Sequence, residues 1–137
     1  GDVVIDEHVL GKLEINQKIL SPGMKYRHYA PKAKCILVYS KDNLKMINKI
    51  NEVLHEYNNP VVIACTENIE MYNIKNKIDI GSKENLEEIS KNLFTDLRKV
   101  DKYNPDIVII EGVNKSGMGL AIMNRLIRAC EYNYIEI

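Results

Sequence analysis

The chain has 137 residues, the length of about one ordinary domain. Hydrophobic residues make up 45% of the sequence and charged residues 28%, which is close to average globular usage and excludes disordered, collagen-like and low-complexity classes. The 19 basic and 19 acidic residues cancel, so no global charge draws the chain toward nucleic acid or an anionic membrane. We therefore expect one packed core, no direct nucleic-acid partner and no membrane association.

Two further features bear on cellular location. The longest apolar runs, such as 35–39 and 107–110, have the length of strands rather than of membrane spans, and the first residues show no signal-peptide pattern. Cys35, Cys65 and Cys130 are far apart and lack the spacing of a zinc or redox pair. These features predict a cytoplasmic protein with buried, reduced thiols.

Charge and pattern divide the chain into three stretches. Residues 1–20 show neither a sustained helical period nor a clean alternation. Residues 21–34 carry four positive charges, two prolines and no acidic residue, which predicts an extended basic loop. From residue 35 to 137, short apolar runs alternate with longer amphipathic segments, and this stretch is the expected folded domain.

The domain begins with a predicted strand over 35–39, followed by a helix that starts near Asp42. The helix has one apolar face, formed by Leu44, Ile47, Ile50, Val53, Leu54 and Tyr57. Asn58, Asn59 and Pro60 end it, and a second strand is expected over 61–64.

The second half of the domain repeats the pattern. Thr66 is expected to cap a short helix over 67–73, and a weak strand over 77–80 ends at Gly81. Ser82 is the expected cap of the next helix, which ends at Asn104-Pro105 and whose apolar stripe consists of Leu86, Ile89, Leu93, Leu97 and Val100. A strand over 107–110, a helix over 118–131 and a strand over 134–137 complete the chain. This alternation predicts an α/β fold: an open, mainly parallel five-stranded sheet with helices on both faces in three layers.

Such a sheet offers a ligand crevice at the carboxyl ends of its strands, where strand order reverses. The loops at 40–42 and 111–119 are its expected walls, and the candidate residues are Ser40, Glu111, Ser116, Gly117 and Gly119. Backbone N–H groups near the two glycines could meet an anion at the helix N-terminus, but the spacing of a dinucleotide-binding loop is absent. The sequence favours the alternative, a turn in which the glycines supply conformational freedom, with Lys115 as a solvated surface charge.

Other site chemistries find little support. The first strand ends with one acidic residue beside a lysine, which disfavours a receiver-type magnesium site, and it lacks the Ser/Thr and Gly loop of a flavin site. His8, His28 and His55 have no partner at the spacing of a catalytic base or a metal pair, and His55 is expected on a helix surface. We therefore assign no catalytic residue and no metal ligand.

The basic loop has chemistry suited to covering a nucleotide. Tyr26 and Tyr29 could stack on a base, while Lys25, Arg27 or His28 could meet phosphates. The alternative is a positively charged tether whose tyrosines pack on a neighbour. Composition alone favours the tether.

Two sequence strings carry a family resemblance. Residues 21–33, SPGMKYRHYAPKA, resemble the interdomain linker of the two-domain threonylcarbamoyl-AMP synthases, and residues 119–128, GLAIMNRLIR, look like the closing helix of their C-terminal domain. In that family an N-terminal YrdC-like domain makes threonylcarbamoyl-AMP and pyrophosphate from threonine, bicarbonate and ATP, for the threonylcarbamoyladenosine modification of tRNA. No counterpart of that domain's ATP and carbonate motifs is present in this sequence.

The resemblance implies a division of the chain: the trailing end of the catalytic domain over 1–20, the interdomain linker over 21–34 and a Rossmann-like accessory domain over 35–137. It implies a gating or regulatory role, no cofactor of its own and no activity alone. The partners would be the N-terminal catalytic domain of the parent enzyme, which uses ATP with Mg²⁺, and, through the linker, ATP or threonylcarbamoyl-AMP. The linker residues expected over the active site are Ser21, Gly23, Met24, Tyr26, His28 and Tyr29. The alternative function is a stand-alone small-molecule or nucleotide binding module that uses the sheet crevice.

Overall fold

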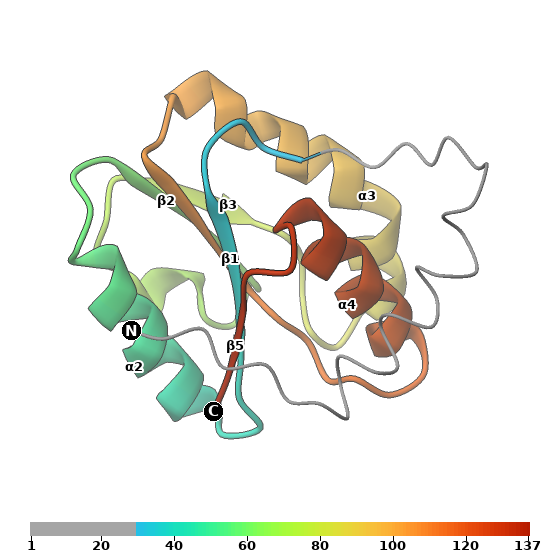
Figure 1. The fold of residues 1–137 in the computed structure, drawn as a ribbon. Coiled ribbons are helices and arrows are strands. Elements are labelled where there is room, and N and C mark those ends of the chain that lie inside the picture. The colour runs from blue at the N-terminus through green and yellow to red at the C-terminus, as the bar shows by residue number, and fades with distance from the viewer. Residues whose placement is uncertain (1–29) are drawn as a thin grey trace.

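A computed structural model describes residues 30–137 of the chain. This part forms a five-stranded sheet in the order β3-β2-β4-β1-β5, and every neighbouring pair of strands is parallel (Figure 1). The predicted α/β class and open sheet are confirmed, and the sheet proves to be entirely parallel. In the described part, no helix is long and apolar enough to cross a membrane.

The first strand and helix lie where the sequence pattern predicts them. Strand β1 covers Cys35–Tyr39 and is buried throughout, because it lies between β4 and β5. Helix α2 covers Asn43–Leu54, and the Asp42 carboxylate caps it by accepting hydrogen bonds from the N–H groups of residues 44 and 45 at 3.1 and 3.2 Å. Leu44 departs from the prediction of an apolar face on the core, because this residue is 58% exposed.

Both predicted caps in the middle of the chain are wrong. Strand β2 covers Pro60–Ala64, the short helix η1 covers only Ile69–Met71, and strand β3 covers Asn76–Asp79. Thr66 does not cap η1; its hydroxyl donates to Asp79 at 2.7 Å. Helix α3 begins later than predicted, covers Leu86–Lys99 and is capped by Asn85; Ser82 instead accepts from the Glu84 N–H and donates to the Glu67 carboxylate.

The chain then completes the centre and one edge of the sheet. A short helix η2, Val100–Tyr103, ends at Asn104 in the left-handed conformation, and β4, Ile107–Glu111, is buried at every position. Helix α4 covers Met118–Ala129 and ends before residue 131, because the two residues after Cys130 adopt positive φ. Strand β5, Tyr134–Glu136, follows at the edge.

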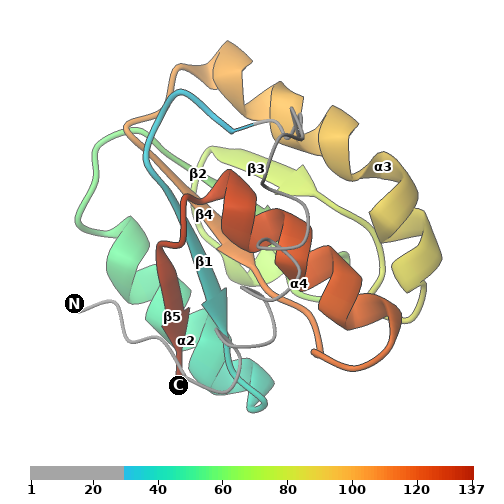
Figure 2. The ribbon, with the colours of Figure 1, turned by 45° about the vertical axis from the view of Figure 1, so that its right-hand side comes forward.

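The helices cover both faces of the sheet. Helices α3 and α4 contact each other on one face, and α2 lies on the other, as Figures 1 and 2 show. This arrangement follows from right-handed crossovers, since the chain leaves β1 in one direction along the sheet and returns from β3 in the other. Strands β1 and β4 are neighbours whose following helices lie on opposite faces, so the sheet has its switch point between them.

Candidate functional site

A crevice of about 220 Å³ opens at the carboxyl ends of the strands, beside the switch point. Its walls come from the loop after β1, the turn after β2, the segment before α3 and the loop after β4. The lining residues are Tyr39, Ser40, Lys41, Asn43, Met46, Cys65, Asn68, Ile80, Lys83, Glu84, Leu86, Glu111, Gly112, Val113 and Asn114. The crevice therefore lies at the predicted position, and it draws on four different connections.

Glu111, the last residue of β4, is the buried carboxylate of this crevice, with 4% of its surface exposed. Its Oε1 accepts a hydrogen bond from the Cys65 backbone N–H at 2.9 Å. Its Oε2 accepts from the Asn68 amide at 3.0 Å and from the Tyr72 hydroxyl at 2.5 Å. Three neutral donors thus hold a charge that would be costly to bury without partners.

The donors are themselves fixed by neighbouring elements. Asn68 and Asn43 exchange amide hydrogen bonds at 2.8 and 3.0 Å, which joins the turn after β2 to the first turn of α2. Tyr72 follows η1 and is completely buried, and burial together with the Glu111 charge raises the pKa of its hydroxyl. Burial is also the main cause that raises the pKa of Cys65 to about 12, so this thiol stays protonated and is a poor nucleophile near neutral pH.

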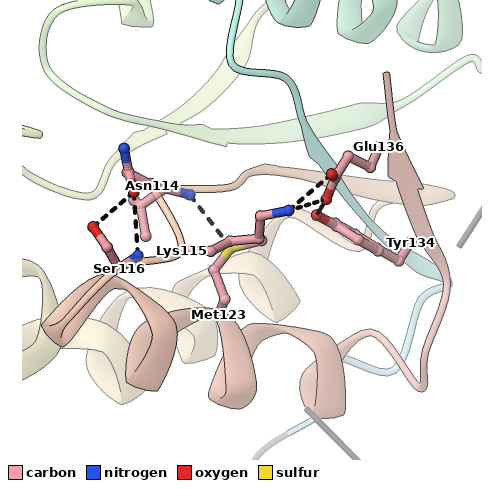
Figure 3. Close-up of polar contacts among 7 residues, drawn as sticks. Asn114, Lys115, Ser116, Met123, Tyr134 and Glu136 are labelled. Carbon is pink, nitrogen blue, oxygen red and sulfur yellow. Dashed lines mark hydrogen bonds and ion pairs between the residues drawn. The ribbon is translucent and has the colours of Figure 1, made fainter. Parts of the chain in front are cut away.

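An ion pair and its hydrogen bonds hold the loop after β4 against β5, as Figure 3 shows. Lys115 Nζ lies 2.7 and 2.8 Å from the two carboxylate oxygens of Glu136, and the Tyr134 hydroxyl donates to the same carboxylate. The ammonium also lies 5.7 Å from the centre of the Tyr39 ring. The expectation of a solvated Lys115 is therefore wrong: β5 pairs beside β1 and brings Glu136 to the loop.

The glycines of this loop have conformational roles. Asn114 Oδ1 accepts from the backbone N–H and the hydroxyl of Ser116 at 3.1 and 2.9 Å, forming a side-chain-stabilised turn (Figure 3). Gly117 has φ +56°, and a Cβ at Gly119 would lie 1.7 Å from the Asn114 carbonyl oxygen. A side chain at residue 119 is therefore excluded by the close approach of loop and helix.

The predicted crevice residues separate into two groups. Ser40 and Glu111 line the crevice, whereas Ser116, Gly117 and Gly119 do not. The N–H groups of Ser116 and Gly119 are already bonded, to Asn114 Oδ1 and to the Ser116 carbonyl oxygen respectively. An anion site at this helix N-terminus remains a prediction, with fewer free donors than the sequence suggested.

The linker candidates lie outside the described residues. Ser21, Gly23, Met24, Tyr26, His28 and Tyr29 all precede residue 30, so their role stays a prediction, as does the division of the chain at 20 and 34. Among the described residues, no group of three or more His, Cys, Asp or Glu side chains could hold a metal ion. His55 is exposed at the end of α2, as expected.

The three cysteines are free and buried, as predicted. Cys35 at the start of β1 and Cys130 after α4 are far apart in sequence, but their sulfur atoms lie 2.8 Å apart. The sequence contains no signal for this pairing, because it depends on α4 returning across the sheet. Asn68 and Tyr72 were also missed as site residues; their one sequence signal is that they flank a short helix directly after a buried strand.

Comparison with known proteins places these features in a family. The profile of the family described as "Threonylcarbamoyl-AMP synthase, C-terminal domain" matches residues 3–130. The threonylcarbamoyl-AMP synthase of Pyrococcus abyssi is 36% identical over 137 residues, all of this chain and 39% of the relative. That of Bacillus subtilis is 32% identical over 133 residues, 94% of this chain and 36% of the relative. The chain thus spans less than half the length of these relatives.

Solved structures of the same family also match this chain. The crystal structure of P. abyssi Sua5 complexed with L-threonine matches with a TM-score of 0.69 and 32% identity, over 91% of this chain and 41% of that one. The crystal structure of the C-terminal Sua5 domain of a hypothetical Sua5 protein from Pyrococcus horikoshii matches with a TM-score of 0.60 and 38% identity, over 79% of this chain and 100% of that one. The chain belongs to the family of C-terminal domains of threonylcarbamoyl-AMP synthases.

Proposed function

We propose that this chain is the accessory part of an L-threonylcarbamoyladenylate synthase, which makes threonylcarbamoyl-AMP from threonine, bicarbonate and ATP for tRNA modification. The observation that carries the proposal is the end-to-end match of this chain to only 39% of a synthase from P. abyssi. The remaining length of that relative has room for a separate catalytic domain. Its partner in the parent enzyme is that N-terminal domain, and the protein works in the cytoplasm.

We assign the catalytic steps of this synthesis to the N-terminal partner domain. The described residues present a protonated, buried thiol at Cys65 and a carboxylate at Glu111 that already accepts three hydrogen bonds, and neither arrangement supplies a nucleophile or a general base. ATP and its Mg²⁺ are accordingly bound by the catalytic domain. The accessory domain contributes gating, because its first strand begins directly after the linker.

The linker is the proposed gate. Closing residues 21–34 over the active site would exclude water from a reactive carbamate and an adenylate, as lids do in other enzymes. Tyr26, His28 and Tyr29 would then contact the bound nucleotide through stacking and hydrogen bonds. Opening would release the product.

The test replaces Tyr26, His28 and Tyr29 together by alanine in the full-length enzyme. Lost stacking and hydrogen bonds are worth about 1–3 kcal/mol each, so kcat/KM for pyrophosphate release should fall roughly tenfold or more. The melting temperature should stay at the parental value. His55→Ala, at an exposed position directly after α2, is the matched control and should leave both quantities unchanged.

Two results would overturn the proposal. If the triple variant keeps parental kinetics and melting temperature, the linker is a tether and not a gate. If this 137-residue chain alone releases pyrophosphate from ATP in the presence of threonine and bicarbonate, the assignment of catalysis to the partner domain is wrong.

A further inference from the structure

The Glu111 carboxylate has an uncompensated charge. Its hydrogen-bond partners are a backbone N–H, an amide, a hydroxyl and the Cys65 thiol, all of them neutral, and among residues 30–137 no lysine or arginine forms an ion pair with it. Buried carboxylates are ordinarily paired with a cation, as Glu136 is with Lys115 in the same domain. A carboxylate offers about four acceptor positions, and only the thiol, a weak donor, takes the fourth, so an ammonium on Oε1 would replace a weak hydrogen bond by a stronger one.

The position of this carboxylate makes it accessible to a small ligand. Glu111 lines the crevice, together with apolar side chains that include Met46, Ile80, Leu86 and Val113. A volume of about 220 Å³ is below the roughly 300–1,000 Å³ of pockets that hold drug-sized ligands. The crevice therefore suits a compound of amino-acid size and is too small to enclose a nucleotide.

The exposed residues that line the crevice carry charges of both signs. Lys41 and Lys83 line the crevice and are exposed, and neither forms an ion pair with another described residue. Glu84 also lines the rim, so the lining has two positive and two negative charges when Glu111 is included. Balanced charges of this kind match a zwitterion, whereas the phosphates of a nucleotide would face the Glu111 and Glu84 carboxylates.

We propose that this crevice binds a free α-amino acid, with its ammonium group on Glu111 Oε1, its carboxylate toward Lys41 and Lys83, and its side chain against the apolar wall. The ammonium would supply the cation that Glu111 lacks. This is a second ligand site, separate from the active site of the proposed synthase, and it would let the accessory domain respond to amino-acid supply. It does not rest on the gating role of the linker.

The 137-residue chain itself is suited to the test, since the corresponding P. horikoshii domain was crystallised as a separate chain. Each proteinogenic L-amino acid is added at millimolar concentration, and the melting temperature is measured; those that raise it are titrated by calorimetry. We expect at least one amino acid to bind saturably. The matching 2-hydroxy acid, which lacks the ammonium, and the matching primary amine, which lacks the carboxylate, should each bind at least about tenfold more weakly.

Two variants then locate the site. Glu111→Gln removes the charge but keeps the shape, and Lys41→Gln with Lys83→Gln alters only exposed side chains. Each should weaken amino-acid binding by about tenfold or more, while Lys91→Gln, on the exposed surface of α3 and outside the crevice, should leave it unchanged. The double lysine variant keeps the test valid should Glu111→Gln fail to fold.

Three outcomes would overturn the inference: no amino acid binds at millimolar concentration, binding is unaffected by the double lysine variant, or AMP binds in the crevice in place of amino acids. None of them affects the proposed synthase function, because no catalytic domain is present in this experiment. Conversely, a linker variant with parental kinetics would leave this inference intact.

Discussion

Two carboxylates lie at the carboxyl ends of the strands on either side of β1 and have different partners. Glu136, at the end of β5, accepts a tyrosine hydroxyl and is neutralised by Lys115 at 2.7 Å. Glu111, at the end of β4, also accepts a tyrosine hydroxyl, but its other donors are an amide and a backbone N–H. The first site includes a cation and serves to fix a loop, whereas the second has only neutral donors and lines an open crevice. The predictions below test this difference.

The largest effect is expected for Glu111→Leu, which leaves the buried Tyr72 hydroxyl, the Asn68 amide and the Cys65 N–H without their acceptor. Each orphaned buried group costs about 1–3 kcal/mol, so the free energy of unfolding should fall by about 3 kcal/mol or more. Urea unfolding followed by circular dichroism measures it. Glu136→Leu, on a carboxylate that is less deeply buried, should cost less; an equal or larger loss there would refute the contrast.

Gly119→Ala should act through the loop rather than through a charge. The added Cβ would lie 1.7 Å from the Asn114 carbonyl oxygen, so the loop must move away from α4. Such overpacking costs about 1–3 kcal/mol of unfolding free energy.

The same movement should displace Lys115, which lies on that loop, from Glu136. Gly119→Ala combined with Lys115→Met should therefore be less destabilising than the sum of the two single changes, by more than about 0.5 kcal/mol. Strict additivity in a double-mutant cycle would show that the loop and the ion pair are independent.

Lys115→Met alone should cost about 1–2 kcal/mol, because it removes a charge-assisted hydrogen bond from a partly buried carboxylate. The same substitution should also change the pKa of Tyr39, which can be followed by spectroscopy. Burial, with a smaller contribution from Glu136, raises the pKa of Tyr39, and the loss of the ammonium beside that ring should raise it further. Absorbance of the phenolate during an alkaline titration measures this shift; a lower Tyr39 pKa would contradict the proposed geometry.

The smallest effect concerns Glu67, an exposed carboxylate on the same edge of the sheet. Donation from the Ser82 hydroxyl, aided by the Lys83 N–H, lowers the pKa of Glu67 from 4.5 to about 2. Because the folded pKa is the lower one, this contribution to stability is present above pH 4.5 and is lost as pH falls toward 2. Glu67→Gln should flatten the stability profile slightly in that window, and Glu56→Gln, at another exposed position, should not.

The order of elements was readable from sequence because it depends on local patterns. Continuous apolar runs predicted β1, β2 and β4, since both faces of a parallel sheet are covered. The capping residues were harder to predict, because a cap depends on the residue at which the helix begins in the folded structure. Ser82 is a good cap by residue type, but α3 begins only at Leu86, and the Ser82 hydroxyl accepts from the Glu84 N–H and donates to Glu67, fifteen residues away in the chain.

What the sequence determined by itself was the α/β class, the parallel sheet and the edge of the sheet at which a crevice opens, together with the family resemblance of residues 21–33 and 119–128. Tertiary structure decided which side chains meet there. Glu111 was recognisable as a residue at the end of a strand, but its donors Asn68 and Tyr72 reach it only because β2 lies beside β4. Lys115 finds Glu136 only because β5 lies beside β1. Strand order places these groups together, and strand order follows from how helices cross a twisted sheet, which no local pattern of residues records.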